Sequence, residues 1–146
     1  MQTLWIFPLD RPVTDAVQTA IGQALADWQA HKQPVQSRLT VVDGYFVVVE
    51  ALSDTSGCGI DWLQKAVTQV LAAAGYSVQD AAQVYYQGAA GVTRVHFQEV
   101  PALLAAGILH QETPVYDHTC VHRGSLEGFR TTVGQCWLSR YLSTPA

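Results

Sequence analysis

Charged side chains are scarce in this sequence. Lys, Arg, Asp and Glu make up 14% of its 146 residues, against about 25% in a typical globular protein. The 8 basic and 12 acidic residues give a net charge of -4, and the basic residues form no run. A duplex nucleic-acid binder needs a basic patch, so we expect no nucleic-acid partner. Low charge beside 49% hydrophobic residues favours a surface partly covered in a homo-oligomer or by a protein partner.

Long apolar runs and a cysteine framework are also missing. No apolar stretch approaches the roughly 20 residues of a membrane-spanning helix, so we expect no membrane partner. The opening MQTLWIFPLDRP has no basic start, and its apolar run is too short for a signal peptide. Three widely spaced cysteines do not form a disulfide framework. A reduced, cytoplasmic protein is the interpretation that follows.

The remaining pattern predicts a mixture of strands and helices. Strands are expected at 3–9, 37–42 and 45–52, and Asp43-Gly44 joins the last two in a tight hairpin. The third strand is apolar on both faces apart from Glu50, as expected of a central strand. The apolar spacing predicts helices from the Thr14 cap to about His31 and from Cys58 to about Gly75. Strands at 83–87 and 92–97 form a second predicted hairpin.

The order strand, helix, strand, strand, helix, strand is that of a ferredoxin-like α+β fold. In that fold both helices cover one face of an antiparallel sheet. The Asp43-Gly44 connection is too short for a crossover between parallel strands. We therefore expect residues 1–97 to form a ferredoxin-like domain. Residues 98–146 are expected to form a small extension packed on the same core, so that the chain is a single compact domain.

Three elements are expected within that extension. Pro101 opens a short helix that Gly107 ends, and a strand follows from Thr113 to Val121. Trp137 and Tyr141 then stand at helical spacing and are expected to pack back onto the domain.

The stretch SDTSGCGIDWL, residues 53–63, places Cys58 at the start of the second helix. Free N–H groups and the helix dipole there would lower the pKa of the thiol. His31, at the end of the first helix, could act as a base for a Cys58 nucleophile, and Asp61 or Asp54 could orient the imidazole. The alternative is that Cys58 is a small buried residue and that His31 only interacts favourably with the dipole at the C-terminus of its helix.

A second candidate site is the run DHTCVH, in which His118, Cys120 and His122 alternate. On a strand, residues two apart point to one face. Two imidazoles and a thiolate suit zinc, with His96, His110 or a water as the fourth ligand. The alternative is an exposed polar edge strand.

Several strings in order along the chain carry a resemblance. They are WQAHKQP (28–34), a hairpin ending in an acidic residue, SGCGID (56–61), VPALLAAGIL and the closing Trp137-Leu-Ser-Arg140. Together they resemble an uncharacterised family of short bacterial proteins often labelled "ABC transporter ATPase". The resemblance implies no established activity, and its usual second string has Ser where this chain has Gly59.

The residues of this sequence do not support the ATPase label. A P-loop needs a Gly-rich loop ending in Gly-Lys-Ser/Thr, whereas the only lysines, Lys32 and Lys65, follow no such loop. The sequence therefore favours a small binding or interaction module with its functional surface around Cys58. A thiol-dependent enzyme using Cys58 and His31 is the first alternative, and a zinc-binding protein using His118, Cys120 and His122 is the second.

Overall fold

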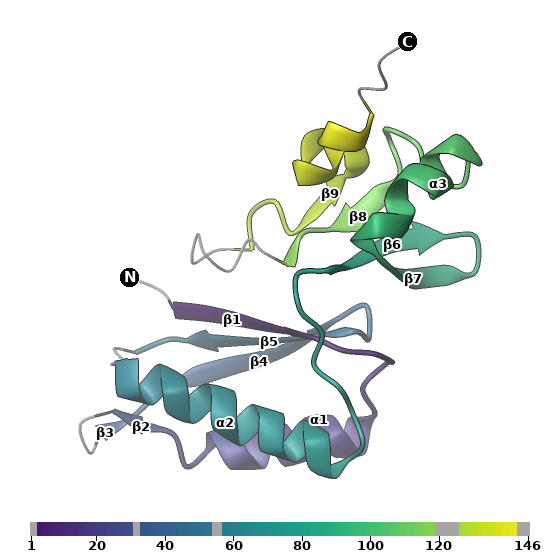
Figure 1. Cartoon of the computed structure of the whole chain (residues 1–146). Helices are drawn as coiled ribbons and strands as arrows, with labels where there is room; N and C mark the ends of the chain where they lie inside the picture. The colour runs from purple at the N-terminus through teal and green to yellow at the C-terminus, as the bar shows by residue number, and fades with distance from the viewer. Residues whose placement is uncertain (1–2, 31–32, 54–56, 119–125, 143–146) are drawn as a thin grey trace. The chain divides into compact units, whose positions relative to one another are not determined.

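The computed structural model describes residues 3–30, 33–53, 57–118 and 126–142. These residues divide into two compact units, one ending at Gln79 and the other beginning at Asp80. Each unit contains an antiparallel sheet with helices beside it (Figure 1). The protein is therefore of the α+β class. None of the helices in the described ranges is both long enough and apolar enough to span a bilayer.

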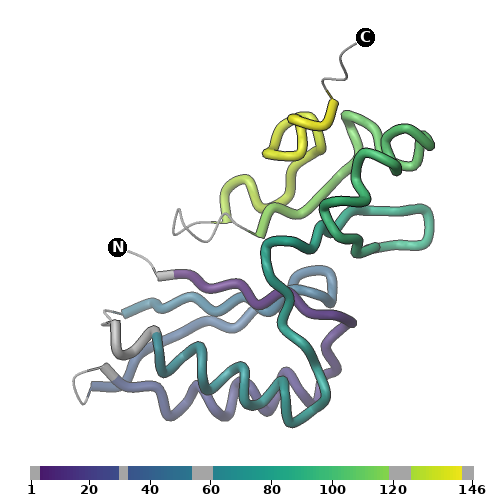
Figure 2. Tube along the Cα trace, viewed as in Figure 1, coloured from purple at the N-terminus to yellow at the C-terminus, as the bar shows by residue number. Residues whose placement is uncertain are grey.

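The first unit is a three-stranded sheet with two long helices. The strand order is β1-β5-β4, and both pairings are antiparallel. Helices α1 and α2 run side by side along one face of this sheet, which Figures 1 and 2 both show. In chain order the elements are β1 (Thr3–Pro8), α1 (Asp15–Leu25), β2 (Gln29–Ala30), β3 (Gln33–Pro34), β4 (Ser37–Val42), β5 (Phe46–Ala51) and α2 (Gly57–Ala73).

The core of this unit lies between the helices and the sheet. Ile21 and Leu25 of α1 and Leu63, Val67 and Leu71 of α2 are at most 5% exposed and belong to one apolar cluster. The cluster also includes β5 side chains that face the helices. Residues 47–49 of β5 are all at most 1% exposed, so the prediction of a central strand apolar on both faces is confirmed.

Local signals set the turns of this unit. Asp43 and Gly44 have φ values of 50° and 79°, the left-handed conformation that tight hairpins need, and the predicted hairpin is confirmed. Thr14 caps α1, because its Oγ1 accepts a hydrogen bond from the Val17 N–H at 3.3 Å. The predicted end of that helix near His31 is wrong. The helix stops at Leu25, and the chain enters the short β2 strand instead.

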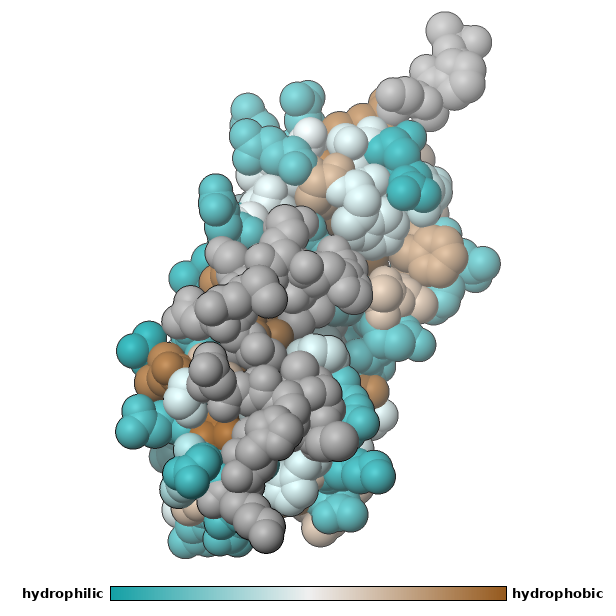
Figure 3. Space-filling model, turned by 90° about the vertical axis from the view of Figure 1, so that its left-hand side faces the viewer, coloured by the Kyte–Doolittle hydropathy of each residue, from teal (hydrophilic) through white to brown (hydrophobic). Residues whose placement is uncertain are grey.

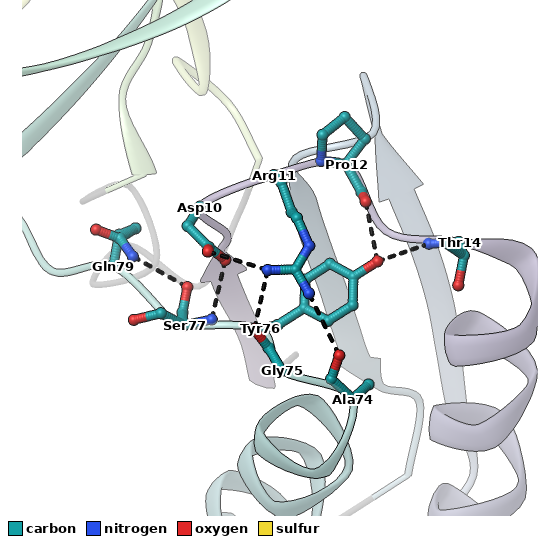
Figure 4. A network of polar contacts seen from close by, with 9 residues as sticks. All are labelled: Asp10, Arg11, Pro12, Thr14, Ala74, Gly75, Tyr76, Ser77 and Gln79. Atoms are coloured by element: carbon teal, nitrogen blue, oxygen red, sulfur yellow. Dashed lines mark hydrogen bonds and ion pairs between the residues drawn. The ribbon is translucent and has the colours of Figure 1, made fainter.

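Arg11 ties the start of α1 to the end of α2 (Figure 4). Its guanidinium donates to the carbonyls of Gly75 at 2.9 Å and Ala74 at 3.3 Å, which satisfies acceptors left open at a helix C-terminus. The same group lies 4.1 Å from the centroid of the Tyr76 ring. The Tyr76 hydroxyl donates to the Pro12 carbonyl at 3.0 Å and accepts from the Thr14 N–H at 3.1 Å.

The second unit is a four-stranded antiparallel sheet in the order β7-β6-β8-β9. Its core contains one apolar cluster that includes Val84, Val100, Leu109, Val133 and Leu138, all at most 3% exposed. The elements are β6 (Gln83–Gly88), β7 (Gly91–His96), the 3-10 helix η1 (Phe97–Glu99), α3 (Val100–Ala105), β8 (Pro114–Tyr116), β9 (Arg130–Thr132) and two further 3-10 helices, η3 (Val133–Gln135) and η4 (Trp137–Tyr141).

The ferredoxin-like fold expected over residues 1–97 is not confirmed. The strand expected to complete the first sheet is β6, but β6 pairs with β7 and β8 in the second sheet. In the described residues, β1 pairs with β5, and the segment after α2 meets the end of β1 in an isolated antiparallel bridge between Leu9 and Val78. The boundary expected at residue 97 therefore lies at residues 79–80, because the hairpin of β6 and β7 belongs with the C-terminal residues.

Candidate functional site

The predicted Cys58 site is only partly within the described residues. Helix α2 begins at Gly57, so the backbone of Cys58 lies in the first helical turn, as expected. Asp61 is exposed on the same helix. The Cys58 side chain and the whole of His31 lie outside the described parts of the chain. The grouping of Cys58, His31 and Asp61 stays a prediction.

The strand that was expected to carry the zinc site is shorter than predicted. Strand β8 ends at Tyr116, and His118 lies in a 3-10 turn. The strand alternation that would align His118 with Cys120 and His122 therefore does not apply at His118, and Cys120 and His122 lie outside the described residues. Within the described ranges, no three His, Cys, Asp or Glu side chains form a group that could hold a metal ion.

His118 is held inside the second unit by hydrogen bonding and ring packing. Its Nε2 lies 3.1 Å from the Gln83 carbonyl oxygen, and because a carbonyl only accepts, Nε2 carries the proton. The Tyr85 ring meets it edge-on at 5.8 Å between centroids. Burial lowers the pKa of His118, while the bond to Gln83 and the charges of Asp117 and Asp80 partly oppose this shift. His118 is thus favoured as a neutral imidazole.

Cys136 shares a small cavity of about 10 Å³ with His118 and Asp117. A volume of that size has room for about one water molecule. Burial raises the pKa of the Cys136 thiol, a backbone hydrogen bond with Leu138 partly lowers it, and the charge of Asp117 raises it further. The protonated thiol is therefore favoured, which suits a packing role and not that of a nucleophile.

A much larger concave surface lies in the second unit. It is an open groove of about 450 Å³ lined by Ala81, Ala82, Phe97, Trp137, Arg140 and Tyr141, and we refer to it as the aromatic groove. Its volume lies in the range of roughly 300–1,000 Å³ that is typical of small-molecule sites. The three aromatic side chains are each partly exposed. Two alanines leave space where larger side chains would fill the groove.

Phe97 is placed at the groove by a capped 3-10 turn. The His96 Nδ1 accepts from the Gln98 N–H at 3.2 Å, and Glu99 Oε2 accepts from the His96 N–H at 2.9 Å, which together form a capping box. The Phe97 N–H donates to the Ala82 carbonyl at 2.9 Å. This bond brings Phe97 beside the alanines that precede β6. The His96 and Phe97 rings also contact, with centroids 4.7 Å apart.

Helix η4 supplies the other lining residues, Trp137, Arg140 and Tyr141. Trp137 and Tyr141 pack edge to face, with centroids 6.3 Å apart and planes at 70°. Leu138, between them in sequence, is 2% exposed and anchors η4 in the core. Arg140 lies over the Trp137 ring at 5.5 Å, and its Nε donates to the Trp137 carbonyl at 3.3 Å. These contacts hold two rings and a cation together in the lining of the groove.

Large exposed hydrophobic side chains are spread along the described chain. They are Leu52, Val78, Ile108 and Leu126. On the face drawn in Figure 3, hydrophobic side chains form separate small areas among hydrophilic ones. The aromatic groove is therefore the more specific feature of the described surface.

The sequence held one signal for this groove, the helical spacing of Trp137 and Tyr141. It held none for Phe97 or the two alanines, which a backbone hydrogen bond and tertiary packing bring to the same place. Comparisons of the chain with family models, with curated proteins and with solved structures give no match.

Proposed function

We propose that this protein is a small binding module and that the aromatic groove takes a planar apolar group. The observation that carries the proposal is the open volume of about 450 Å³ lined by Phe97, Trp137 and Tyr141. Aromatic rings that are partly exposed around a concave surface offer edge-to-face and stacked contacts to a flat ligand. The surface around Cys58 remains the location that the sequence favours for such a module.

The test is a titration of the ¹⁵N-labelled full-length protein with indole, followed by amide chemical shifts. Binding in the groove is expected to move the amide signals of residues 81–82, 97 and 137–141 together and saturably. Trp137→Leu, which keeps an apolar side chain on η4 and removes the ring, is expected to weaken binding about twofold to tenfold, since ring contacts contribute about 0.5–1.5 kcal/mol beyond area burial.

Trp62→Leu is the matched control, because Trp62 stacks on Trp28 in the first unit at 6.3 Å and does not line the groove. This variant is expected to bind indole as the wild type does. Shifts that follow no saturation curve, or equal weakening in both variants, would rule out the groove as the binding surface.

The runner-up is a thiol-dependent enzyme that uses Cys58 as nucleophile and His31 as base. It is favoured by one observation, the start of α2 at Gly57, which puts Cys58 in the turn where the helix dipole stabilises a thiolate. Iodoacetamide is then expected to modify Cys58 well below pH 8.5 and faster than Cys136, whose thiol pKa is raised by burial. Slow modification with an ordinary pH profile would remove this candidate.

A further inference from the structure

We infer that the planar ligand of the aromatic groove carries a carboxylate and that Arg140 binds it. This inference rests on the proposed function and adds the chemical class of the ligand.

Arg140 is a cation held at a defined place in the groove lining. Its Nε donates to the Trp137 carbonyl at 3.3 Å, and its guanidinium carbon lies 5.5 Å from the Trp137 ring centroid. The hydrogen bond uses the Nε–H and leaves the N–H groups of both Nη atoms for a ligand. Two parallel N–H donors match the two oxygens of a carboxylate, so the donor fork is pre-organised for a bidentate contact.

No acidic side chain of the described residues pairs with Arg140. Asp10 pairs with Arg11, and Glu50 pairs with Arg38. Two acidic residues close in sequence to the lining residues, Asp80 and Glu99, accept hydrogen bonds from backbone N–H groups. Asp80 accepts from the Ala82 N–H at 2.9 Å, and Glu99 accepts from the His96 N–H at 2.9 Å. A protein with a net charge of -4 thus presents a cation beside the rings of this groove.

The rings and the cation together define the ligand. A flat ring contacts Phe97, Trp137 and Tyr141, and a carboxylate on a short linker reaches the Nη atoms of Arg140 beside Trp137. Two sources share this chemistry. One is a free aromatic acid, and the other is the C-terminal aromatic residue of a peptide, which combines a ring with a terminal carboxylate.

The experiment compares the dissociation constants of indole-3-propionate and indole-3-propionamide for the full-length protein, measured by amide shifts at low salt. The two probes share ring and linker and differ in charge. We expect the acid to bind roughly fivefold to tenfold more tightly, the gain of a charge-assisted pair at a partly exposed site. Added NaCl is expected to weaken binding of the acid and to leave the affinity for the amide unchanged.

Variants assign the effect to Arg140. Arg140→Gln is expected to remove the preference for the acid while leaving the affinity for the amide nearly unchanged. Arg140→Lys is expected to keep part of the preference, because it retains the charge and loses the fork. Arg94→Gln, which changes an exposed arginine of β7 outside the groove, is expected to bind both probes as the wild type does.

The outcomes separate this inference from the proposed function. Equal affinity for acid and amide, or a preference that survives Arg140→Gln, overturns the inference and leaves a groove that binds neutral rings. Failure of both probes to bind overturns the proposed function and the inference with it. A third arm uses acetyl-Gly-Trp and its C-terminal amide. Tighter binding of this acid than of indole-3-propionate identifies a peptide C-terminus as the source, and weaker binding identifies a free acid.

Discussion

Arg11 joins two helices of the first unit through one guanidinium group. Replacement by Ala would leave the carbonyls of Ala74 and Gly75 without their side-chain donor and would remove the contact with the Tyr76 ring. We expect Arg11→Ala to lower the free energy of unfolding by about 1–2 kcal/mol, from lost charge-assisted hydrogen bonds and a cation–π contact. Urea unfolding of the full-length chain measures the change.

Arg38→Ala is the matched control for that variant. Arg38 is also an exposed arginine, and its ion pair with Glu50 is long, at 3.9 Å. Exposed pairs of this kind contribute about 0–1 kcal/mol, so a small loss is expected. If the two variants lost the same stability, the Arg11 contacts would have no special role.

The burial of His118 predicts that the free energy of unfolding depends on pH. Burial holds its pKa below the ordinary value, which is about 6.5, so the unfolded chain takes up a proton at a higher pH than the folded chain does. The contribution of His118 to stability is therefore complete above about pH 6.5 and is lost as the pH falls toward the folded-state pKa. The loss amounts to about 1.4 kcal/mol for each pKa unit between the two states.

The measurement is urea unfolding of the wild type and of His118→Phe at pH 7.5 and pH 5. The variant is expected to lose less stability than the wild type between these two values. His110→Gln, at an exposed position, is expected to follow the wild type. An unchanged pH difference in His118→Phe would contradict the assignment.

The sequence analysis singled out His118 but not Arg11, and it predicted the contacts of neither residue. Arg11 and Gly75 are 64 positions apart, and no local pattern links them. His118 was expected on a strand with its partners two positions away, whereas its described hydrogen bond reaches Gln83 across the sheet. Side-chain roles of this kind depend on pairing between distant strands, which a single sequence does not specify.

The hairpin of β4 and β5 depends on a glycine in the left-handed region. Gly44 has φ of 79°, and a Cβ added there would meet the Cβ of Pro12 at 3.3 Å. We expect Gly44→Ala to destabilise the protein by about 1–2 kcal/mol, because that conformation is costly for a residue with a Cβ. Thermal and urea unfolding both measure this loss.

Gly22→Ala makes the same chemical change within α1 and has the opposite expected sign. An added Cβ there would meet only the Leu39 side chain, at an ordinary 3.9 Å. Alanine is the better helix former by about 0.5–1 kcal/mol, so a modest stabilisation is expected. Destabilisation by both variants to the same extent would show that the turn conformation is not what matters at Gly44.

Elements marked by local signals agreed best with the sequence. The Thr14 cap, the Asp43-Gly44 turn and the positive φ of Gly75 and Gly107 lie where the helix and turn rules place them. The predicted strand at 113–121 was too long, since β8 covers only Pro114–Tyr116. Strand length depends on how far a partner strand runs alongside, and β9 pairs with β8 over only three residues.

In the whole molecule, the sequence predicted the order of the longer helices and strands up to β7, missed the short strands β2, β3 and β9, and did not predict how the strands group into sheets. The sequence order fits one ferredoxin-like sheet, whereas the described residues form a three-stranded sheet, the short β2–β3 pair and a four-stranded sheet that contains β6. The C-terminal residues decide this, because β8 pairs with β6. The aromatic groove follows from that grouping, since Phe97 after β7 and the rings of η4 belong to the same unit.

The proposed function and the role of Arg140 both depend on binding of a planar aromatic acid in the aromatic groove. Its most direct test is an isotope-filtered NOE spectrum of the ¹³C,¹⁵N-labelled protein with unlabelled indole-3-propionate. We expect intermolecular NOEs from the indole protons to the rings of Phe97, Trp137 and Tyr141. NOEs from the bound probe to other residues alone would contradict it, as would the absence of binding at saturating probe concentration.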